Sequence, residues 1–283
     1  MLRAADSPPP GPPVLQNKTK HKGTIPVYAT ARKTFSVLGV RVDALQIPEV
    51  IGQMREWIAR RDACHYVAVT GMHGITEAQH HPDFKGVLAD ADLVVPDGMP
   101  LVWIGRLRGK SLWRRVYGPE LMLRFCRETA PTGCRHFLYG GEAGAPEQLA
   151  QFLKKACTGI CIAGTYSPPF RSTTPEEDEA ILESINRAAP DVLWVALGTP
   201  KQETWMHQHR NKLRVPVMAG VGAAFDFLSS RKKQAPVWMQ ENGLEWLFRL
   251  LQEPQRLWKR YLVNGSEFVF LAALELLGFR DFD

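Results

Sequence analysis

The sequence predicts an α/β fold: a Rossmann-like, mostly parallel sheet with helices on both faces, plus a C-terminal helical appendage. Short apolar runs rich in β-branched and aromatic residues recur between residues 35 and 225, as in strands buried on both faces. Segments with apolar residues at helical spacing separate these runs, which favours parallel strands joined by helices. Residues 231–283 contain no strand-like run, and their aromatic residues alternate with basic ones.

The elements are expected in a regular order. Residues 35–42 alternate like a strand or short hairpin, and residues 47–60 carry apolar side chains at helical spacing. The expected strands of the sheet are 66–69, 93–95, 136–139, 160–162, 192–197 and 215–218. The expected helices between them are 76–90, 99–108, 118–130, 145–156, 175–189 and 200–212.

Composition divides the chain into three regions. Residues 1–34 are rich in proline and lack apolar periodicity, so we expect a mostly disordered tail. Residues 35–230 form the predicted Rossmann-like core. Residues 231–283 form the appendage, which we expect to bind a membrane or an acceptor.

The overall composition limits the classes of function. Lys and Arg number 35 against 29 Asp and Glu, and the net charge of +6 favours an anionic partner: a nucleotide, a diphosphate, nucleic acid or an acidic membrane. No apolar run reaches the ~18–20 residues of a membrane span, and the N-terminal segment lacks the apolar stretch of a signal peptide. The five cysteines include no CxxC pair, which indicates reduced thiols in a cytoplasmic protein.

Small and polar residues follow five of the predicted strands at the point where each ends. Ligands of open parallel sheets bind outside the carboxyl ends of the strands. Glycine lets a ligand approach the backbone, and the following helix N-terminus favours an anion. The sequence therefore predicts a nucleotide-sized crevice. Its candidate residues are Thr70, His73, Asp97, Gly140, Gly141, Gly198, Lys201, Gln202, Gly220 and Gly222.

Several of these residues also have a purely structural interpretation. Asp97 with Gly98 fits a turn in which Asp97 caps the next helix. Residues 199–202 fit a capping box, with Thr199 as the cap and Gln202 as its partner. Residues 220–225 imitate a dinucleotide loop, but the third glycine and a downstream acidic residue are missing, so we do not expect NAD.

Two patterns imitate metal sites. Asp90 and Asp92 resemble a DxD motif, but they precede a strand, so we interpret them as a solvated turn. Cys157 and Cys161 have no accompanying His or Cys pair, and we interpret them as small buried residues. The sequence therefore predicts no metal site.

Six blocks occur in one order: residues 93–98, 115–118, 197–203, 220–228, 235–238 and 243–254. With them the chain, from about residue 35 to 263, resembles the WecG/TagA/CpsF family of bacterial glycosyltransferases, glycosyltransferase family twenty-six. The resemblance implies an inverting, metal-independent transfer of a hexose, N-acetylmannosamine or a related sugar, from a UDP-sugar to a polyprenyl-diphosphate-linked sugar. It places the reaction in cell-envelope polysaccharide synthesis, peripheral on the inner face of the cytoplasmic membrane.

The resemblance also implies roles for individual residues. Asp97 matches the family's proposed catalytic base, and Thr70 and Gln202 match residues of its active site. The appendage positions thought to hold a diphosphate are Arg249, Arg256 and Lys259. In one departure, Met72 stands where many members carry Asn, and we expect the neighbouring His73 to provide that contact instead.

Two other functions compete with this one: another nucleotide-dependent Rossmann-like transferase, and a basic nucleic-acid-binding protein. The appendage tryptophans fall at helical spacing, which favours core or interface positions over contacts with nucleic acid. Arg249, Arg256, Lys259 and Arg260 would form one basic stripe if Pro254 did not break the helix. Residues 268–277 are apolar and are expected to lie in the membrane interface or to pack on a second subunit of a homo-oligomer.

Overall fold

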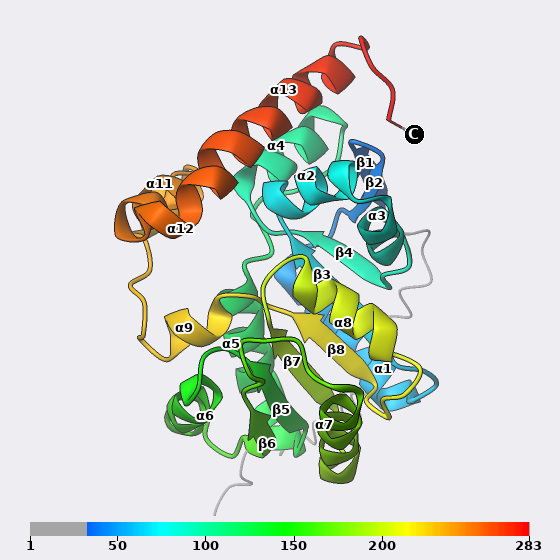
Figure 1. Cartoon of the computed structure of the whole chain (residues 1–283), viewed down its shortest axis with the longest axis vertical. Helices are drawn as coiled ribbons and strands as arrows, with labels where there is room; N and C mark the ends of the chain where they lie inside the picture. Colours follow the sequence, from blue (N-terminus) through cyan, green and yellow to red (C-terminus); the bar gives the residue numbers. More distant parts are fainter. Residues whose placement is uncertain (1–32, 283) are drawn as a thin grey trace, which may run out of the picture. The chain divides into compact units, whose positions relative to one another are not determined.

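The computed structural model describes residues 33–282. Its main sheet is parallel, with the strand order β4-β3-β8-β7-β5-β6 (Figure 1). The strands are β3 (His65–Thr70), β4 (Leu93–Pro96), β5 (Arg135–Gly140), β6 (Cys161–Tyr166), β7 (Val192–Ala196) and β8 (Val217–Gly220). The predicted α/β, Rossmann-like architecture is confirmed. The predicted N-terminal tail lies outside the described residues, apart from its last two.

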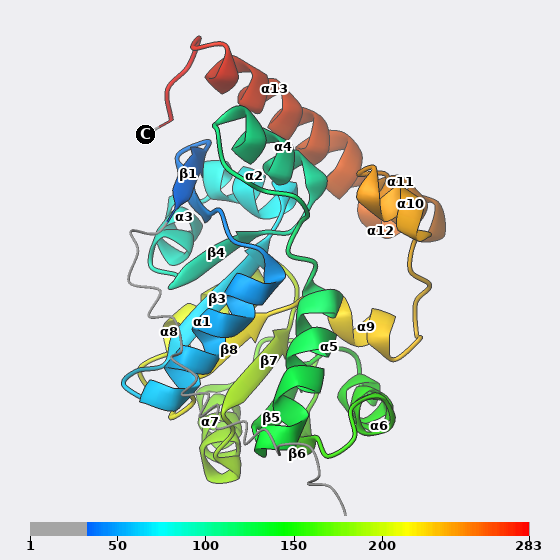
Figure 2. The same cartoon turned by 180° about the vertical axis from the view of Figure 1, so that it is seen from behind.

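Helices cover both faces of the sheet (Figures 1 and 2). One face carries α1 (Ile47–Arg60), α5 (Gly118–Thr129), α6 (Ala145–Ala156) and the short α9 (Ala224–Leu228). The other face carries α2 (Met72–His80), α3 (Pro82–Ala89), α4 (Met99–Leu107), α7 (Pro175–Ala188) and α8 (Lys201–His209). A 3-10 turn, η1 (Ala130–Thr132), follows α5.

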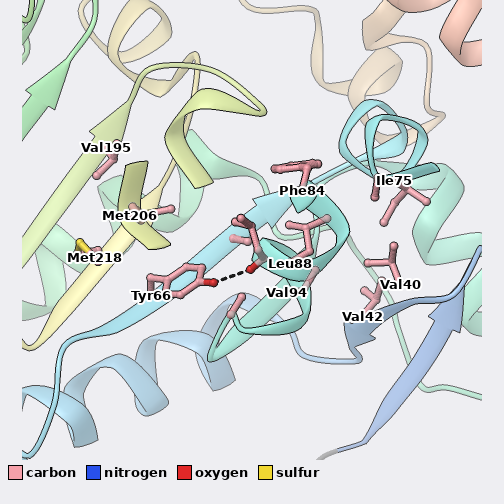
Figure 3. Packing of buried hydrophobic residues seen from close by; sticks show 14 of the residues in the cluster. Val40, Val42, Tyr66, Ile75, Phe84, Leu88, Val94, Val195, Met206 and Met218 are labelled. Carbon is pink, nitrogen blue, oxygen red and sulfur yellow. Dashed lines mark hydrogen bonds between the residues drawn. The ribbon is translucent and has the colours of Figure 1, made fainter. Parts of the chain in front are cut away.

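The strands are apolar throughout because successive side chains enter two different cores. In β4, Val94 joins the core under α3, which also contains Phe84 and Leu88 (Figure 3). Its neighbours Leu93 and Val95 join the core under α1 and α5. The fold therefore depends on a continuous apolar run at each central strand.

A hairpin protects the outer edge of β4. Strands β1 (Thr34–Val37) and β2 (Val40–Asp43) are antiparallel and turn at Leu38 and Gly39, whose φ angles are 51° and 67°. Positive φ at both positions is the geometry that favours a tight hairpin. The Asp43 carboxylate accepts a hydrogen bond of 2.8 Å from the edge N–H of Val94, which satisfies a donor that an open edge would leave exposed.

Three predicted elements differ from the structure. The expected helix 76–90 is two helices, because Pro82 opens α3 and cannot continue the hydrogen bonding of α2. Strand β6 is longer than expected, since this half-buried edge strand includes Gly164 and Thr165. Strand β8 begins after Pro216, which lacks the N–H that a central strand requires.

The C-terminal region is helical, as predicted. It contains α10 (Val237–Glu241), α11 (Glu245–Gln252), α12 (Pro254–Trp258), a π-helical turn η2 (Lys259–Val263) and α13 (Asn264–Leu276). Pro254 occupies the first turn of α12 and separates it from α11, so the continuous helix that one basic stripe would require is not present. Helix α13 lies beside α2 and buries Phe268 and Leu271 in the core (Figure 1). Within residues 33–282, no helix combines the length and apolar character needed to cross a membrane.

Candidate active site

The carboxyl ends of β3 and β4 bring Thr70 and Asp97 together. Thr70 pairs with Pro96 in the sheet register, and the Asp97 N–H donates a hydrogen bond of 2.7 Å to the Thr70 carbonyl. A Cβ at Gly71 would lie 2.3 Å from the Asp97 carbonyl oxygen. Only glycine permits so close an approach of the two loops. The loops that carry Thr70 and Asp97 are therefore packed directly against each other at this edge of the sheet.

Asp97 is not a helix cap. Gly98 occupies the cap position of α4, and no side chain caps that helix. Among the described residues, Asp97 Oδ1 has no hydrogen-bond partner although it is buried, while 33% of the side chain remains accessible. Burial raises the pKa of Asp97 to about 6, and the positive charge of Arg115 opposes that rise. A carboxylate whose pKa lies near neutrality suits general base catalysis.

Arg115 joins the appendage to this site. It lies in the loop before α5, with one guanidinium nitrogen 3.8 Å from Asp97 Oδ1 and its carbon atom Cζ 4.0 Å from the centre of the Tyr117 ring. The same guanidinium pairs with the buried carboxylate of Glu245 in α11. The sequence analysis assigned no role to either residue. The sequence feature that could have indicated them is their position in the blocks 115–118 and 243–254.

The four basic residues of the predicted stripe differ in their surroundings. Arg249 and Arg260 are half-buried, and both positive charges lower the pKa of Asp97. Arg260 Nε is buried and has no hydrogen-bond partner among residues 33–282. Arg256 and Lys259 are exposed, and Arg256 pairs with Glu253 at 2.7 Å. Of the three positions that the resemblance assigns to a diphosphate, Arg249 is therefore half-buried, whereas Arg256 and Lys259 are exposed.

Gln202 is buried at the start of α8 and does not form the predicted capping box. Its Oε1 accepts a hydrogen bond of 3.1 Å from the Gly222 N–H, and its Nε2 donates to Glu203 Oε1 at 3.0 Å. A Cβ at Gly220 would lie 3.0 Å from Gln202 Nε2. Gln202, Gly220 and Gly222 therefore form one contact group between β7 and β8.

Thr70 and His73 lie on the α2 side of this edge. Thr70 Oγ1 is buried without a partner in the described chain, and a Cβ at Gly74 would lie only 2.0 Å from it. His73 Nδ1 is 3.3 Å from Nδ2 of Asn264 in α13, and burial lowers the pKa of His73 to about 4. His73 is therefore neutral near pH 7 and accepts a hydrogen bond that ties α2 to α13. Met72 packs against the core.

The remaining predicted residues line the same edge farther from Asp97. Gly140 ends β5 and Gly141 follows it, and this strand is four strand positions from β4, or roughly 19 Å at the usual spacing. Gly141 donates a hydrogen bond of 2.9 Å to the Ala196 carbonyl at the end of β7. Gly198 has a φ of +78° with open space at its Cβ position, and Lys201 is exposed at the start of α8.

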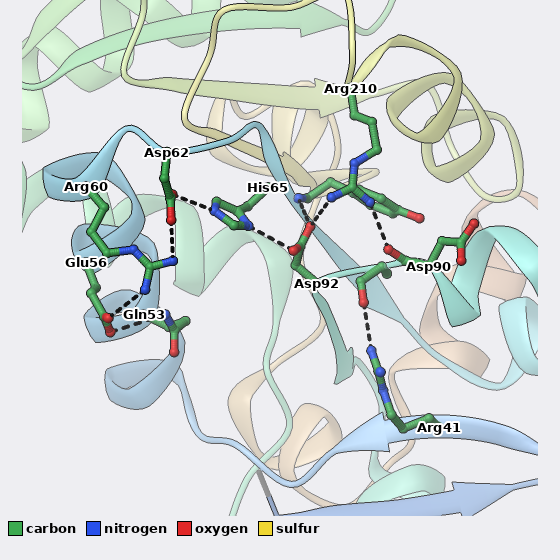
Figure 4. A network of polar contacts seen from close by, with 11 residues as sticks. Arg41, Gln53, Glu56, Arg60, Asp62, His65, Asp90, Asp92 and Arg210 are labelled. Atoms are coloured by element: carbon green, nitrogen blue, oxygen red, sulfur yellow. Dashed lines mark hydrogen bonds and ion pairs between the residues drawn. The ribbon is translucent and has the colours of Figure 1, made fainter. Parts of the chain in front are cut away.

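The DxD-like residues lie at the opposite, amino edge of the sheet (Figure 4). Asp92 accepts hydrogen bonds from His65 at 2.8 Å, from the Tyr66 N–H at 3.0 Å and from Arg210 at 3.1 Å. Asp92 is thus held in a structural network rather than in a solvated turn. Residues 33–282 contain no group of three or more His, Cys, Asp or Glu side chains arranged to hold a metal ion. Cys157 is buried, Cys161 is half-buried, and both are free thiols.

Known protein sequences resemble this chain over most of its length. Residues 35–281 match the glycosyl transferase WecG/TagA/CpsF family. The chain is 33% identical over 186 residues to an N-acetylglucosaminyldiphosphoundecaprenol N-acetyl-beta-D-mannosaminyltransferase of Bacillus spizizenii, a match that covers 66% of this chain and 70% of that protein. A Bacillus subtilis protein of the same name is 33% identical over 180 residues, which cover 64% of this chain and 68% of the relative.

Proposed function

The chain belongs to the WecG/TagA/CpsF family of glycosyl transferases, and from this premise we propose its donor, its acceptor and the roles of its residues. The donor is a UDP-activated hexose, N-acetylmannosamine or a close relative. The acceptor is a sugar linked to a polyprenyl diphosphate. The names of the relatives support the transferred sugar and the acceptor, because they describe transfer of N-acetylmannosamine to an N-acetylglucosaminyl diphosphoundecaprenol.

The observation that carries the proposal is a set of buried polar atoms without partners at one edge of the sheet. Folded proteins leave few such atoms unpaired, because each costs about 1–3 kcal/mol. The set includes carboxylate, hydroxyl and guanidinium groups, which together suit the hydroxyls of a sugar and the charge of a diphosphate. In residues 33–282 its members are Thr70 Oγ1, Asp97 Oδ1, Tyr117 OH and Arg260 Nε, while Arg108 Nε and His209 Nδ1 lack hydrogen-bond partners elsewhere in the fold.

Asp97 acts as the general base of an inverting displacement. Its carboxylate takes the proton of the acceptor hydroxyl while that oxygen attacks the anomeric carbon of the donor. The bond from this carbon to the diphosphate oxygen breaks, and UDP leaves from the opposite face. The sugar develops positive charge in the transition state, and a nearby carboxylate stabilises it.

Arg249 and Arg260 stabilise the negative charge that develops on the departing diphosphate. Both guanidinium groups act on Asp97 electrostatically, so they lie close enough to act on a group that reacts beside it. We assign this role to the two arginines and propose no metal ion for it. Thr70 and Gln202 hold the donor, at the ends of β3 and β7.

The appendage brings the site to the inner face of the cytoplasmic membrane. Helix α13 buries one side in the core, while its other side exposes Val269 and Phe270. Arg256 and Lys259 are exposed in the same region and contribute about 1 kcal/mol each near an anionic leaflet. The polyprenyl chain of the acceptor requires such proximity. This arrangement supports peripheral, salt-sensitive attachment.

The experiment has a binding arm and a transfer arm. Calorimetry measures binding of UDP in the presence of a chelator, with S-adenosylmethionine and short duplex DNA as controls for the two competing functions. The transfer arm offers a panel of UDP-sugars and a short-chain polyprenyl-diphosphate N-acetylglucosamine. We expect UDP binding without magnesium, and a product whose new linkage has the opposite anomeric configuration from the donor. Absence of UDP binding, or transfer with retention, would overturn the proposal.

A further inference from the structure

Glu203 is a fully buried carboxylate that accepts hydrogen bonds from two neighbouring side chains. It lies in the first turn of α8, with no exposed surface. Its Oε1 accepts two hydrogen bonds, from Gln202 Nε2 at 3.0 Å and from Thr199 Oγ1 at 2.9 Å. Burial of a carboxylate is costly, and such groups persist in proteins where their hydrogen bonds are needed.

The consequence of these bonds is a single orientation for the Gln202 amide. A side-chain amide has two ends of similar size, and a half-turn exchanges its donor and acceptor. Here Glu203 Oε1 faces Nε2, and the Gly222 N–H faces Oε1. The reversed orientation would place an oxygen against a carboxylate and an NH2 against an N–H. Both contacts would be repulsive, so Glu203 and Gly222 together exclude that orientation.

We propose that Glu203 is a positioning residue, which fixes the Gln202 amide so that the remaining N–H of Nε2 serves the donor sugar or its diphosphate. This inference rests on the proposed function of the site. Glu203 has no accessible surface, and the role assigned to it acts through the Gln202 amide that it orients. Burial raises the pKa of Glu203, and the hydrogen bonds from Gln202 and Thr199 and the positive charge of Arg260 oppose that rise.

The test uses Glu203→Gln, Glu203→Met, Gln202→Met and the double variant Gln202→Met/Glu203→Met. Glu203→Met keeps the shape but removes the acceptor, and we expect it to lower kcat by up to about 10²-fold, as misplacement of a substrate-binding group does. Glu203→Gln keeps an acceptor oxygen for Gln202 and should recover most of that loss. The double variant should be no worse than Gln202→Met, because Glu203 acts through Gln202.

A spectroscopic measurement and a matched control separate positioning from stability. In protein labelled with 15N-glutamine, the side-chain amide signal of Gln202 should shift in Glu203→Met and remain close to wild type in Glu203→Gln. Asp191→Asn alters a buried carboxylate at the amino edge, which accepts from the Arg135 N–H at 2.8 Å. We expect it to lower stability without changing kcat. If Glu203→Met unfolds, Thr199→Val perturbs the same carboxylate more gently and should give a smaller loss of kcat and a smaller shift.

The outcomes also distinguish this inference from the proposed function. Wild-type protein that neither binds UDP nor transfers sugar would overturn the proposed function. An active wild type with an unshifted Gln202 signal in Glu203→Met would overturn only the positioning role. Additive losses in the double variant, or a Glu203→Gln variant as impaired as Glu203→Met, would likewise reject it.

Discussion

Replacement of Asp97 by Asn tests the base directly, because it preserves the shape of the side chain and removes its ability to take a proton. Asp97 Oδ1 has no hydrogen-bond partner within the described chain, so the substitution breaks no such bond at that atom. General base catalysis contributes about 10²–10⁴-fold, and we therefore expect kcat to fall by at least about 10²-fold. The negative charge next to Arg249 and Arg260 disappears. UDP binding should consequently be retained or strengthened.

Asp97→Asn should also differ from wild type in its free energy of unfolding, and the difference should depend on pH. Burial raises the pKa of Asp97 from 3.8 to about 6, so the folded protein holds this proton more tightly than the unfolded chain does. The corresponding stabilisation is complete below about pH 4 and is lost as the pH rises through about 6. A rise of that size corresponds to at most about 3 kcal/mol, and to less here because 33% of the side chain is accessible. Asp97→Asn should therefore unfold at higher denaturant than wild type at pH 8, with a smaller difference at pH 4.

Denaturant titrations at the two pH values and steady-state kinetics measure both consequences. In wild type, kcat/KM should rise with pH through about 6 and then level off, and Asp97→Asn should lose that rise. Near-normal turnover of the variant would refute the assignment of the base. Equal stability of the two proteins at pH 8 would refute the claim that an ionised Asp97 is held there at a cost to the fold.

Three further predictions follow from the appendage. Arg249→Ala and Arg260→Ala should each weaken UDP binding in calorimetry, because a buried charge-assisted bond to a diphosphate is lost. Arg256→Ala, whose side chain is exposed, should retain that affinity. The double variant Arg256→Glu/Lys259→Glu should sediment less with anionic liposomes at low salt while still binding UDP; equal sedimentation of both proteins would argue against an electrostatic attachment. Asn264→Ala should lower the free energy of unfolding by about 0.5–1.5 kcal/mol, since it removes donors to half-buried acceptors that join α13 to α2. An unchanged denaturation midpoint would show that this contact does not hold α13 in place.

The sheet was predictable because its central strands are buried on both faces and are therefore apolar without interruption. The expectation of an uninterrupted apolar strand does not hold at the edge of the sheet, where β6 is only half-buried and contains Gly164 and Thr165. It also says nothing about where a helix divides, since Pro82 is as compatible with starting a new helix as with ending the old one. The apolar pattern of the sequence thus identifies strands reliably where both faces of the strand are buried, and less well where one face is exposed.

The site was partly predictable for a different reason. Thr70 and Asp97 follow neighbouring parallel strands, and topology alone places their loops together. Arg115 and Glu245 are separated by 130 residues, and no local pattern links them. No role for Glu203 was predicted, because an acidic residue in the first turn of a helix is ordinarily explained by its favourable interaction with the helix dipole.

The charges around Asp97 explain why the appendage belongs to the active site. Burial raises the pKa of Asp97, and Arg115, which also pairs with the buried Glu245 and so anchors α11, gives the largest opposition to that rise. Arg249 and Arg260 lower the same pKa as well. A diphosphate bound between them would weaken this effect and raise the pKa of the base, making Asp97 a stronger proton acceptor once the donor is in place. A general base gains most when its pKa lies near the working pH. In the proposed mechanism, donor binding and activation of the base are therefore coupled through the same two arginines, and this coupling requires the C-terminal helices to lie against the sheet.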